Sequence, residues 1–128
     1  MSTIKAANLQ NTGSGAPVFK NSSGTEIGQL AKAWVNFNGT GTVAIRTSFN
    51  VSSITDLATG RYQVNFTNAV AADCCPVMFN SGDGSGSFEA FGNAFTGGIT
   101  TGTAAIKVSS HGSGFVDSNL FFVVVFGA

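Results

Sequence analysis

The amino-acid sequence predicts an all-β protein, an antiparallel β-sandwich or jelly-roll-like head with an extended N-terminal arm. Short runs of β-branched and aromatic residues recur from Ala31 onward, separated by clusters of Gly, Asn, Asp and Ser, a pattern typical of sandwiches and barrels. No long segment has helical periodicity. The chain has 128 residues, of which 43% are hydrophobic, which suits one domain with a short arm.

Residues 1–30 are predicted to form the docking arm, and residues 31–128 the β-sandwich domain. The arm region is rich in Asn, Ser, Thr and Gly and has too few apolar residues for a core of its own. It would become ordered against a partner, to which it docks through its apolar side chains, Ile4, Leu9, Val18 and Phe19. A short helix over Thr25–Lys32 is an alternative, which Gly28 disfavours.

The first strands of the head are expected at Ala31–Phe37 and Thr42–Phe49, joined as a hairpin by the turn dipeptide Asn38-Gly39. Arg61–Thr67 alternates apolar with polar residues, as a half-buried strand does. Further strands are expected at Cys75–Phe79, where Pro76 indicates an edge or a bulge, and at Thr103–Ser109. The segment Ser87–Phe95 has mixed spacing that also allows one helical turn.

The last predicted strand, Leu120–Phe126, is apolar at every position. Such a strand must be covered on both faces. In a two-layer sandwich an outward row of Phe and Val needs another subunit, whereas a central strand covered by loops of the same chain is the alternative. We therefore predict an interface with other subunits made of Phe121, Phe122, Val123, Val124, Val125 and Phe126.

Charge is scarce: charged residues make up 9% of the chain, with six Lys or Arg, six Asp or Glu and no net charge. Typical soluble proteins have roughly 25% charged residues. The deficit and the twelve Phe residues favour a shared core between copies over the alternative, a neutral secreted β-domain. Scattered cations argue against a nucleic-acid partner, and no apolar run is long enough to span a membrane.

No catalytic spacing connects the few Asp, Glu and His residues, so we expect no enzyme, no catalytic residues and no cofactor. A triad of His111, Asp117 and a nearby Ser is arithmetically possible but lacks the usual motif. The adjacent Cys74 and Cys75 are expected to be buried thiols with no metal. Two Gly-rich segments are the expected exposed recognition loops, with candidate residues Asp83, Ser85, His111 and Ser113.

The segment Lys32–Arg46, which reads KAWVNFNGTGTVAIR, continues through Ser48–Asp56 and Tyr62–Thr67. Together with the opening Met1–Lys5, it resembles tail-fibre-type proteins of marine phages and cyanophages over about half the chain. The sequence departs from that pattern at Leu57–Gly60 and at Cys74-Cys75, which affects the local loops. From Ser81 to Ala128 the sequence shows no specific match to these proteins.

The resemblance implies a bacteriophage virion structural protein, made in the host cytoplasm, since no signal peptide is seen, and located at the phage tail. It would form a homotrimer, attach to other tail or baseplate proteins and contact the host surface, with a surface polysaccharide as a candidate ligand. Alternatives are a capsid decoration or cement protein, and a stand-alone carbohydrate-binding domain. In a carbohydrate-binding domain the aromatic residues that could stack on sugar rings would be Trp34 and Tyr62, but both are expected in the core instead. A depolymerase would need a longer chain and a carboxylate pair.

Overall fold

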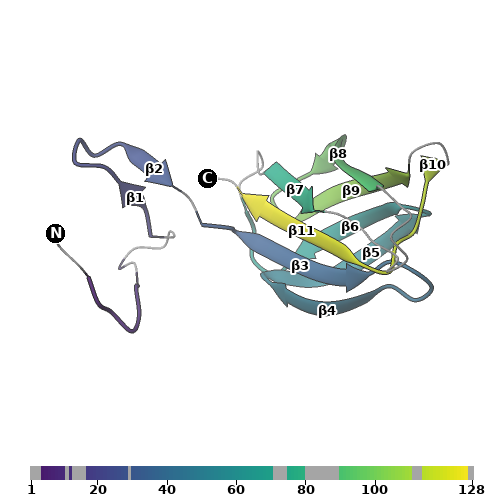
Figure 1. The fold of residues 1–128 in the computed structure, drawn as a ribbon, viewed down its shortest axis with the longest axis horizontal. Coiled ribbons are helices and arrows are strands. Elements are labelled where there is room, and N and C mark those ends of the chain that lie inside the picture. Colours follow the sequence, from purple (N-terminus) through teal and green to yellow (C-terminus); the bar gives the residue numbers. More distant parts are fainter. Residues whose placement is uncertain are drawn as a thin grey trace. The chain divides into compact units, whose positions relative to one another are not determined.

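The computed structural model describes residues 4–10, 12, 17–28, 30–70, 75–79, 90–110 and 114–126. For residues 75–79, 90–98 and 110 it describes the strand pairing alone. Within these ranges the chain contains strands and no helix (Figure 1). The strands are β1 (Phe19–Lys20), β2 (Glu26–Gly28), β3 (Ala33–Asn38), β4 (Ala44–Phe49), β5 (Val51–Ala58), β6 (Arg61–Phe66), β7 (Cys75–Phe79), β8 (Ala90–Ile99), β9 (Thr103–Ser110), β10 (Gly114–Phe115) and β11 (Phe121–Phe126).

The chain divides into two compact units, Met1–Leu30 and Ala31–Ala128. In the first unit, β1 and β2 pair as a hairpin. The Oδ1 atom of Asn21 accepts hydrogen bonds from the backbone N–H groups of Ser23 and Thr25, which closes the turn. The alternative of a helix over Thr25–Lys32 is wrong, because this turn directs Glu26–Gly28 back along β1. That residues 1–30 form an extended arm remains a prediction.

The second unit is an antiparallel β-sandwich, as the sequence predicts. Its front sheet has the order β4-β3-β11-β7. In its back sheet β9 pairs with β6, β8 and β10, and β6 also pairs with β5. Every described pairing is antiparallel. The two sheets are the two layers of Figure 1, with β11, β3 and β4 toward the viewer.

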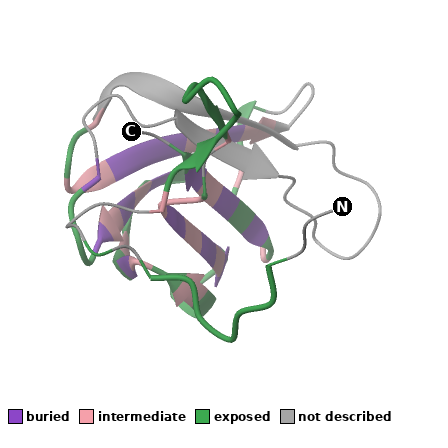
Figure 2. Cartoon of the chain, turned by 90° about the vertical axis from the view of Figure 1, so that its left-hand side faces the viewer, coloured by how far each residue is buried: buried purple, intermediate pink, exposed green. Residues whose placement is uncertain are grey.

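The core lies between the sheets and is built mainly by alternation of inward and outward residues along the strands. Figure 2 shows this alternation as stripes of buried and less buried residues. The front sheet contributes alternate residues of β3 and β11, and the back sheet those of β6 and β9. The fully buried side chains include Val35, Phe37, Tyr62, Val64, Ile106, Val108, Phe121, Val123 and Val125.

An aromatic cluster fills one part of this core. The rings of Phe37 and Phe121 stack, with centroids 4.7 Å apart, and both contact Tyr62, at 5.3 and 5.0 Å. Such pairs stabilise a core beyond their buried area. Gly39 belongs to the same packing, since a Cβ atom on it would collide with Phe121 and with the Tyr62 hydroxyl.

The predicted hairpin is confirmed, but its turn is longer than two residues. Asn38 pairs with Ala44, so the loop covers residues 39–43. The Asn38 side chain accepts a hydrogen bond from the Thr40 backbone and donates one to the Thr40 carbonyl. The Gly39 N–H donates to the Ser118 carbonyl at 2.8 Å, outside the hairpin, so Asn38-Gly39 does not form the tight turn that the dipeptide suggests.

The predicted strands at Arg61–Thr67, Cys75–Phe79, Thr103–Ser109 and Leu120–Phe126 are confirmed to within about one residue at their ends. The β7 strand, which contains Pro76, lies at the edge of the front sheet, as Pro predicts. The segment Ala90–Ile99 is a strand, so no helical turn forms in the described part of Ser87–Phe95. The β5 strand was not predicted.

Between β4 and β5 the chain passes from one sheet to the other at Asn50, the one non-Gly residue with positive φ in the described chain, at 56°. The Asn50 Nδ2 atom donates to the Lys32 and Asn68 carbonyls, at 3.0 and 3.2 Å, and Oδ1 accepts from the Asn68 N–H at 2.8 Å. Asn tolerates this conformation because its short polar side chain bonds to nearby backbone. Asn50 thus fixes the corner of the sandwich.

Candidate functional site

The final strand divides its side chains between the core and the surface. Phe121, Val123 and Val125 lie in the core. Phe122 and Phe126 are 39% and 37% exposed on the outward face of the front sheet, with Val124 half-buried between them. Of the six residues predicted for a trimer interface, only Phe122, Val124 and Phe126 are therefore available to a partner of the folded domain.

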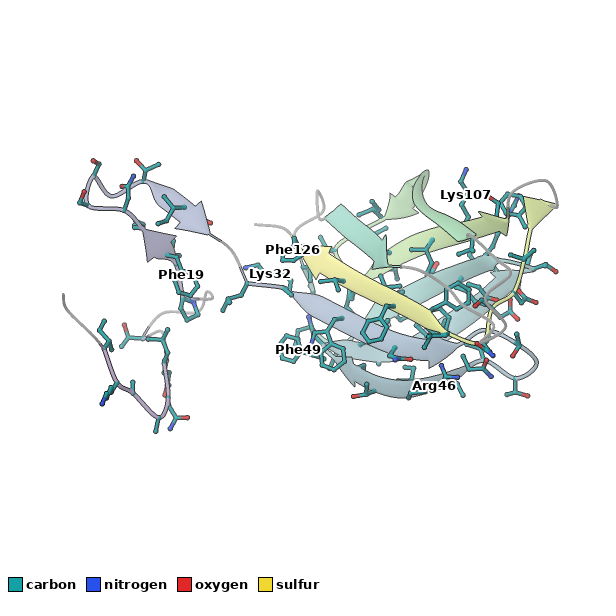
Figure 3. All side chains as sticks on the ribbon, viewed as in Figure 1. Phe19, Lys32, Arg46, Phe49, Lys107 and Phe126 are labelled. Atoms are coloured by element: carbon teal, nitrogen blue, oxygen red, sulfur yellow. The ribbon has the colours of Figure 1, made fainter. Side chains whose placement is uncertain are left out.

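Neighbouring strands extend this outward row into a surface, which we call the apolar face: Trp34, Phe49, Phe122, Val124 and Phe126. Trp34 on β3 lies between Phe49 on β4 and Val124 on β11 in the strand register. Phe49 is 54% exposed and Trp34 is half-buried. Figure 3 labels Phe49 and Phe126 near the same end of the front sheet.

The expectation that both Trp34 and Tyr62 lie in the core is half right. Tyr62 is fully buried, but Trp34 points to the outward face of the front sheet. Along this strand Trp34 shares its face with Asn36 and Asn38, whereas Ala33, Val35 and Phe37 share the other. The two amides at alternate positions were therefore the signal in the sequence that Trp34 faces outward.

The border of the apolar face is polar, with little charge. Arg46 on β4 donates from Nη1 to the Asn36 Oδ1 atom at 3.3 Å, and both side chains lie beside the apolar residues. The outward positions of β3 after Trp34 are Asn36 and Asn38, both half-buried. An apolar centre within a polar border is the arrangement found in protein interfaces.

The outward face of the back sheet has the opposite character. Asn65 on β6 donates from Nδ2 to the hydroxyls of Ser53 and Thr55 on β5, both at 2.9 Å. Gln63 donates to the Asn65 Oδ1 atom at 2.8 Å. The row of amides and hydroxyls is thus connected by hydrogen bonds across two strands. This face suits water or a hydroxylated ligand and not an apolar partner.

Two cations lie at the end of this polar row. Arg61 on β6 is directly opposite Lys107 on β9 in the strand register. The Arg61 guanidinium carbon lies 4.3 Å from the centre of the Phe115 ring, within the range of a cation–π interaction. Phe115 on β10 pairs with Ser109 on β9, two residues from Lys107, so these side chains share one face.

A hydrogen-bond network connects the core with the loop before β11. The Tyr62 hydroxyl contacts Asp117 Oδ1 at 2.5 Å and the Gly39 carbonyl at 2.9 Å, and the Gly60 N–H donates to the same Asp117 atom at 2.7 Å. Burial raises the pKa of Tyr62 far above its ordinary value, and the hydrogen bond to Asp117 raises it further. The phenol therefore stays protonated and serves as a fixed donor.

The other predicted site residues lie apart from these faces or outside the described part of the chain. Ile4, Leu9, Val18 and Phe19 are all exposed in the first unit, between 42% and 92%. The recognition-loop candidates Asp83, Ser85, His111 and Ser113 lie outside the described residues, as does Cys74. Cys75 pairs with Phe126 in the strand register, and its side chain is not described.

Within the described ranges, no group of three or more His, Cys, Asp and Glu residues comes together as a metal site. None of the described elements is a helix long and apolar enough to cross a bilayer. Comparison of the chain with protein families, with curated proteins and with solved structures found no match.

Proposed function

We propose that this chain is a structural and binding module of an assembly, in which copies associate through the apolar face. The observation that carries this proposal is the row of Phe49, Trp34 and Val124 across three strands, continued by Phe122 and Phe126. A contiguous apolar surface exposed on a folded domain marks a site of association. In the back sheet the exposed apolar side chains Leu57 and Phe115 lie on β5 and β10, which are separated by β6 and β9, so they form no such row.

The composition favours a second copy of this chain as the partner that covers the apolar face. The chain has no net charge and few charged residues, so two copies approach without electrostatic repulsion. Self-association would cover the same side chains on every copy, as closed symmetric oligomers do. The resemblance over Lys32–Thr67 supports a homotrimer, since that is the form it implies.

Within this frame we propose a bacteriophage tail fibre that attaches to tail or baseplate proteins and contributes to host contact, without enzymatic activity. The resemblance to tail-fibre-type proteins supports the location, and the exposed apolar residues of the first unit support a docking role for residues 1–30. A capsid decoration protein would use the same two features, so the location in the virion separates these alternatives.

Self-association can be tested with a matched pair of variants. The double variant Phe122→Ser and Phe126→Ser should shift the mass measured by light scattering from oligomer to monomer. Leu57→Ser, which removes a side chain that is 48% exposed on the back sheet, should leave the oligomer intact. A wild-type chain that is monomeric at all concentrations would overturn the proposal.

The location can be tested by immunogold electron microscopy of phage particles with an antibody against this chain. Label at the tail supports the fibre. Label over the head replaces it with capsid decoration, and particles without label exclude both virion roles.

A further inference from the structure

We infer that Arg61 and Lys107, with Phe115, form a binding site for the acidic groups of a polysaccharide on the outward face of the back sheet. This inference rests on the proposed role in host contact and adds a ligand class to it. It uses the face opposite the apolar face, so that either proposal can fail alone.

The first argument is the placement of the two cations. Arg61 and Lys107 are directly opposite each other on antiparallel strands, where like charges destabilise the sheet. The chain has only six Lys and Arg residues, so this pairing does not follow from a crowded basic surface. No ion pair to either side chain occurs among the described residues. A bound anion would relieve the repulsion between them.

The second argument is the preorganisation of Arg61. Its guanidinium lies over the Phe115 ring at 4.3 Å, which restricts the side chain while its N–H edge can still bind a planar or tetrahedral anion. Lys107 projects away from the sandwich in Figure 3. Its position opposite Arg61 in the strand register places both side chains on the same face, beside the same ligand.

The third argument is the surface that leads away from the cations. Gln63 and Asn65 follow Arg61 at alternate positions of β6, and Ser53 and Thr55 stand beside them on β5. From Arg61 to Asn65 this surface extends about 14 Å along the strand, at roughly 3.4 Å per residue. Amides and hydroxyls are the partners that sugar hydroxyls need. Two cations and no net charge are too few for nucleic acid, which requires many phosphate contacts.

The test is binding of the full-length wild-type protein to alginate, which carries carboxylates, to dextran sulfate, to neutral dextran and to single-stranded DNA. We expect binding to alginate, to dextran sulfate or to both, which identifies the acidic group, and no binding to dextran. Arg61→Gln with Lys107→Gln should weaken this binding at least about tenfold, the effect of losing charge-assisted hydrogen bonds.

The matched control is Lys5→Gln with Lys32→Gln, which removes the same charge at residues outside the back sheet and the apolar face and should bind as wild type does. Phe115→Leu should weaken binding with no change in charge. Equal losses in both double variants, no binding to either acidic polymer, or equally tight binding to DNA would each overturn the inference. Light scattering and thermal melts on the same samples separate a loss of binding from a loss of assembly or folding.

Discussion

The hydroxyl of Tyr62 on β6 and the carboxylate of Asp117, 55 positions later in the chain, are joined by a hydrogen bond of 2.5 Å. The same carboxylate holds the Gly60 N–H, and the same hydroxyl faces the Gly39 carbonyl. Loops from both sheets thus meet at one phenol.

Tyr62 makes the protein sensitive to alkali. Its pKa is raised by burial and by Asp117, from an ordinary value of 10.0, so the folded protein holds this proton more tightly than the unfolded chain does. The resulting stability is complete below about pH 10 and is lost as the pH rises above it. Because Tyr62 is the only Tyr, the tyrosinate absorbance should rise only together with unfolding.

The control for this titration is Tyr62→Phe, which should lose about 1–3 kcal/mol at neutral pH, because the Gly39 carbonyl and Asp117 lose their donor. Its stability should then lack the decline that Tyr62 causes above pH 10. A wild-type tyrosinate signal that appears near pH 10 while circular dichroism still reports the folded state would contradict the expectation.

Gly39 is required by packing. Gly39→Ala should destabilise the domain by about 1–3 kcal/mol, because its Cβ would collide with Phe121 and Tyr62 in a close-packed core. Gly102→Ala is the matched control, since nothing lies within 4 Å of its Cβ position and its φ is not positive. It should be neutral or stabilise by up to about 1 kcal/mol. Urea unfolding followed by Trp34 fluorescence measures both, and equal effects would refute the packing argument.

Phe121 and Phe122 are neighbours on β11 that face opposite ways. Phe121→Ala should lower the free energy of unfolding by about 3–5 kcal/mol, as loss of a buried aromatic ring does. Phe122→Ala should change the stability of the monomer by less than about 1 kcal/mol, because its ring is 39% exposed, while weakening self-association. Thermal unfolding at low protein concentration compares them. The register of β11 would be wrong if Phe122→Ala were the more damaging change.

Asn50 combines a strained backbone with four hydrogen bonds made by its side chain. Asn50→Ala should cost about 2–4 kcal/mol, from the lost bonds and from a left-handed conformation that Ala tolerates poorly. Asn50→Gly also lacks the side-chain hydrogen bonds, but Gly adopts the left-handed conformation without strain. This variant should therefore be about 1 kcal/mol more stable than Asn50→Ala. If Gly and Ala were equivalent in chemical denaturation, backbone strain at this corner would be unimportant.

Several strands could be predicted from sequence because their burial alternates. In β6, Tyr62, Val64 and Phe66 alternate with polar residues, and these three are the buried positions. The same holds for Ala104, Ile106 and Val108 in β9, although Ala105 on the other face is also buried. The β11 strand was correctly placed, but a run of apolar residues contains no information on which of them face inward.

Other features depended on contacts that no local pattern reveals. The β5 strand, whose sequence is VSSITDLA, is mostly exposed at the edge of its sheet, so it lacks a strong hydrophobic alternation. The pairing of Arg61 with Lys107 joins residues far apart in the chain, and only the strand register brings them together. The hydrogen bond between Tyr62 and Asp117 also joins residues far apart in the chain, so the sequence did not predict that the loop before β11 contacts the core.

The position of β11 also constrains when the domain can form during synthesis. In the front sheet, β11 lies between β3 and β7 and pairs with both. The hairpin of β3 and β4 therefore cannot be joined to β7 before Phe121–Phe126 has left the ribosome. Until then the hairpin of β3 and β4 has an open inner edge, the kind of edge that pairs with other chains. A ribosome stalled before Leu120 would therefore hold an aggregation-prone chain, and chaperones should bind this nascent protein longest just before its final strand is made.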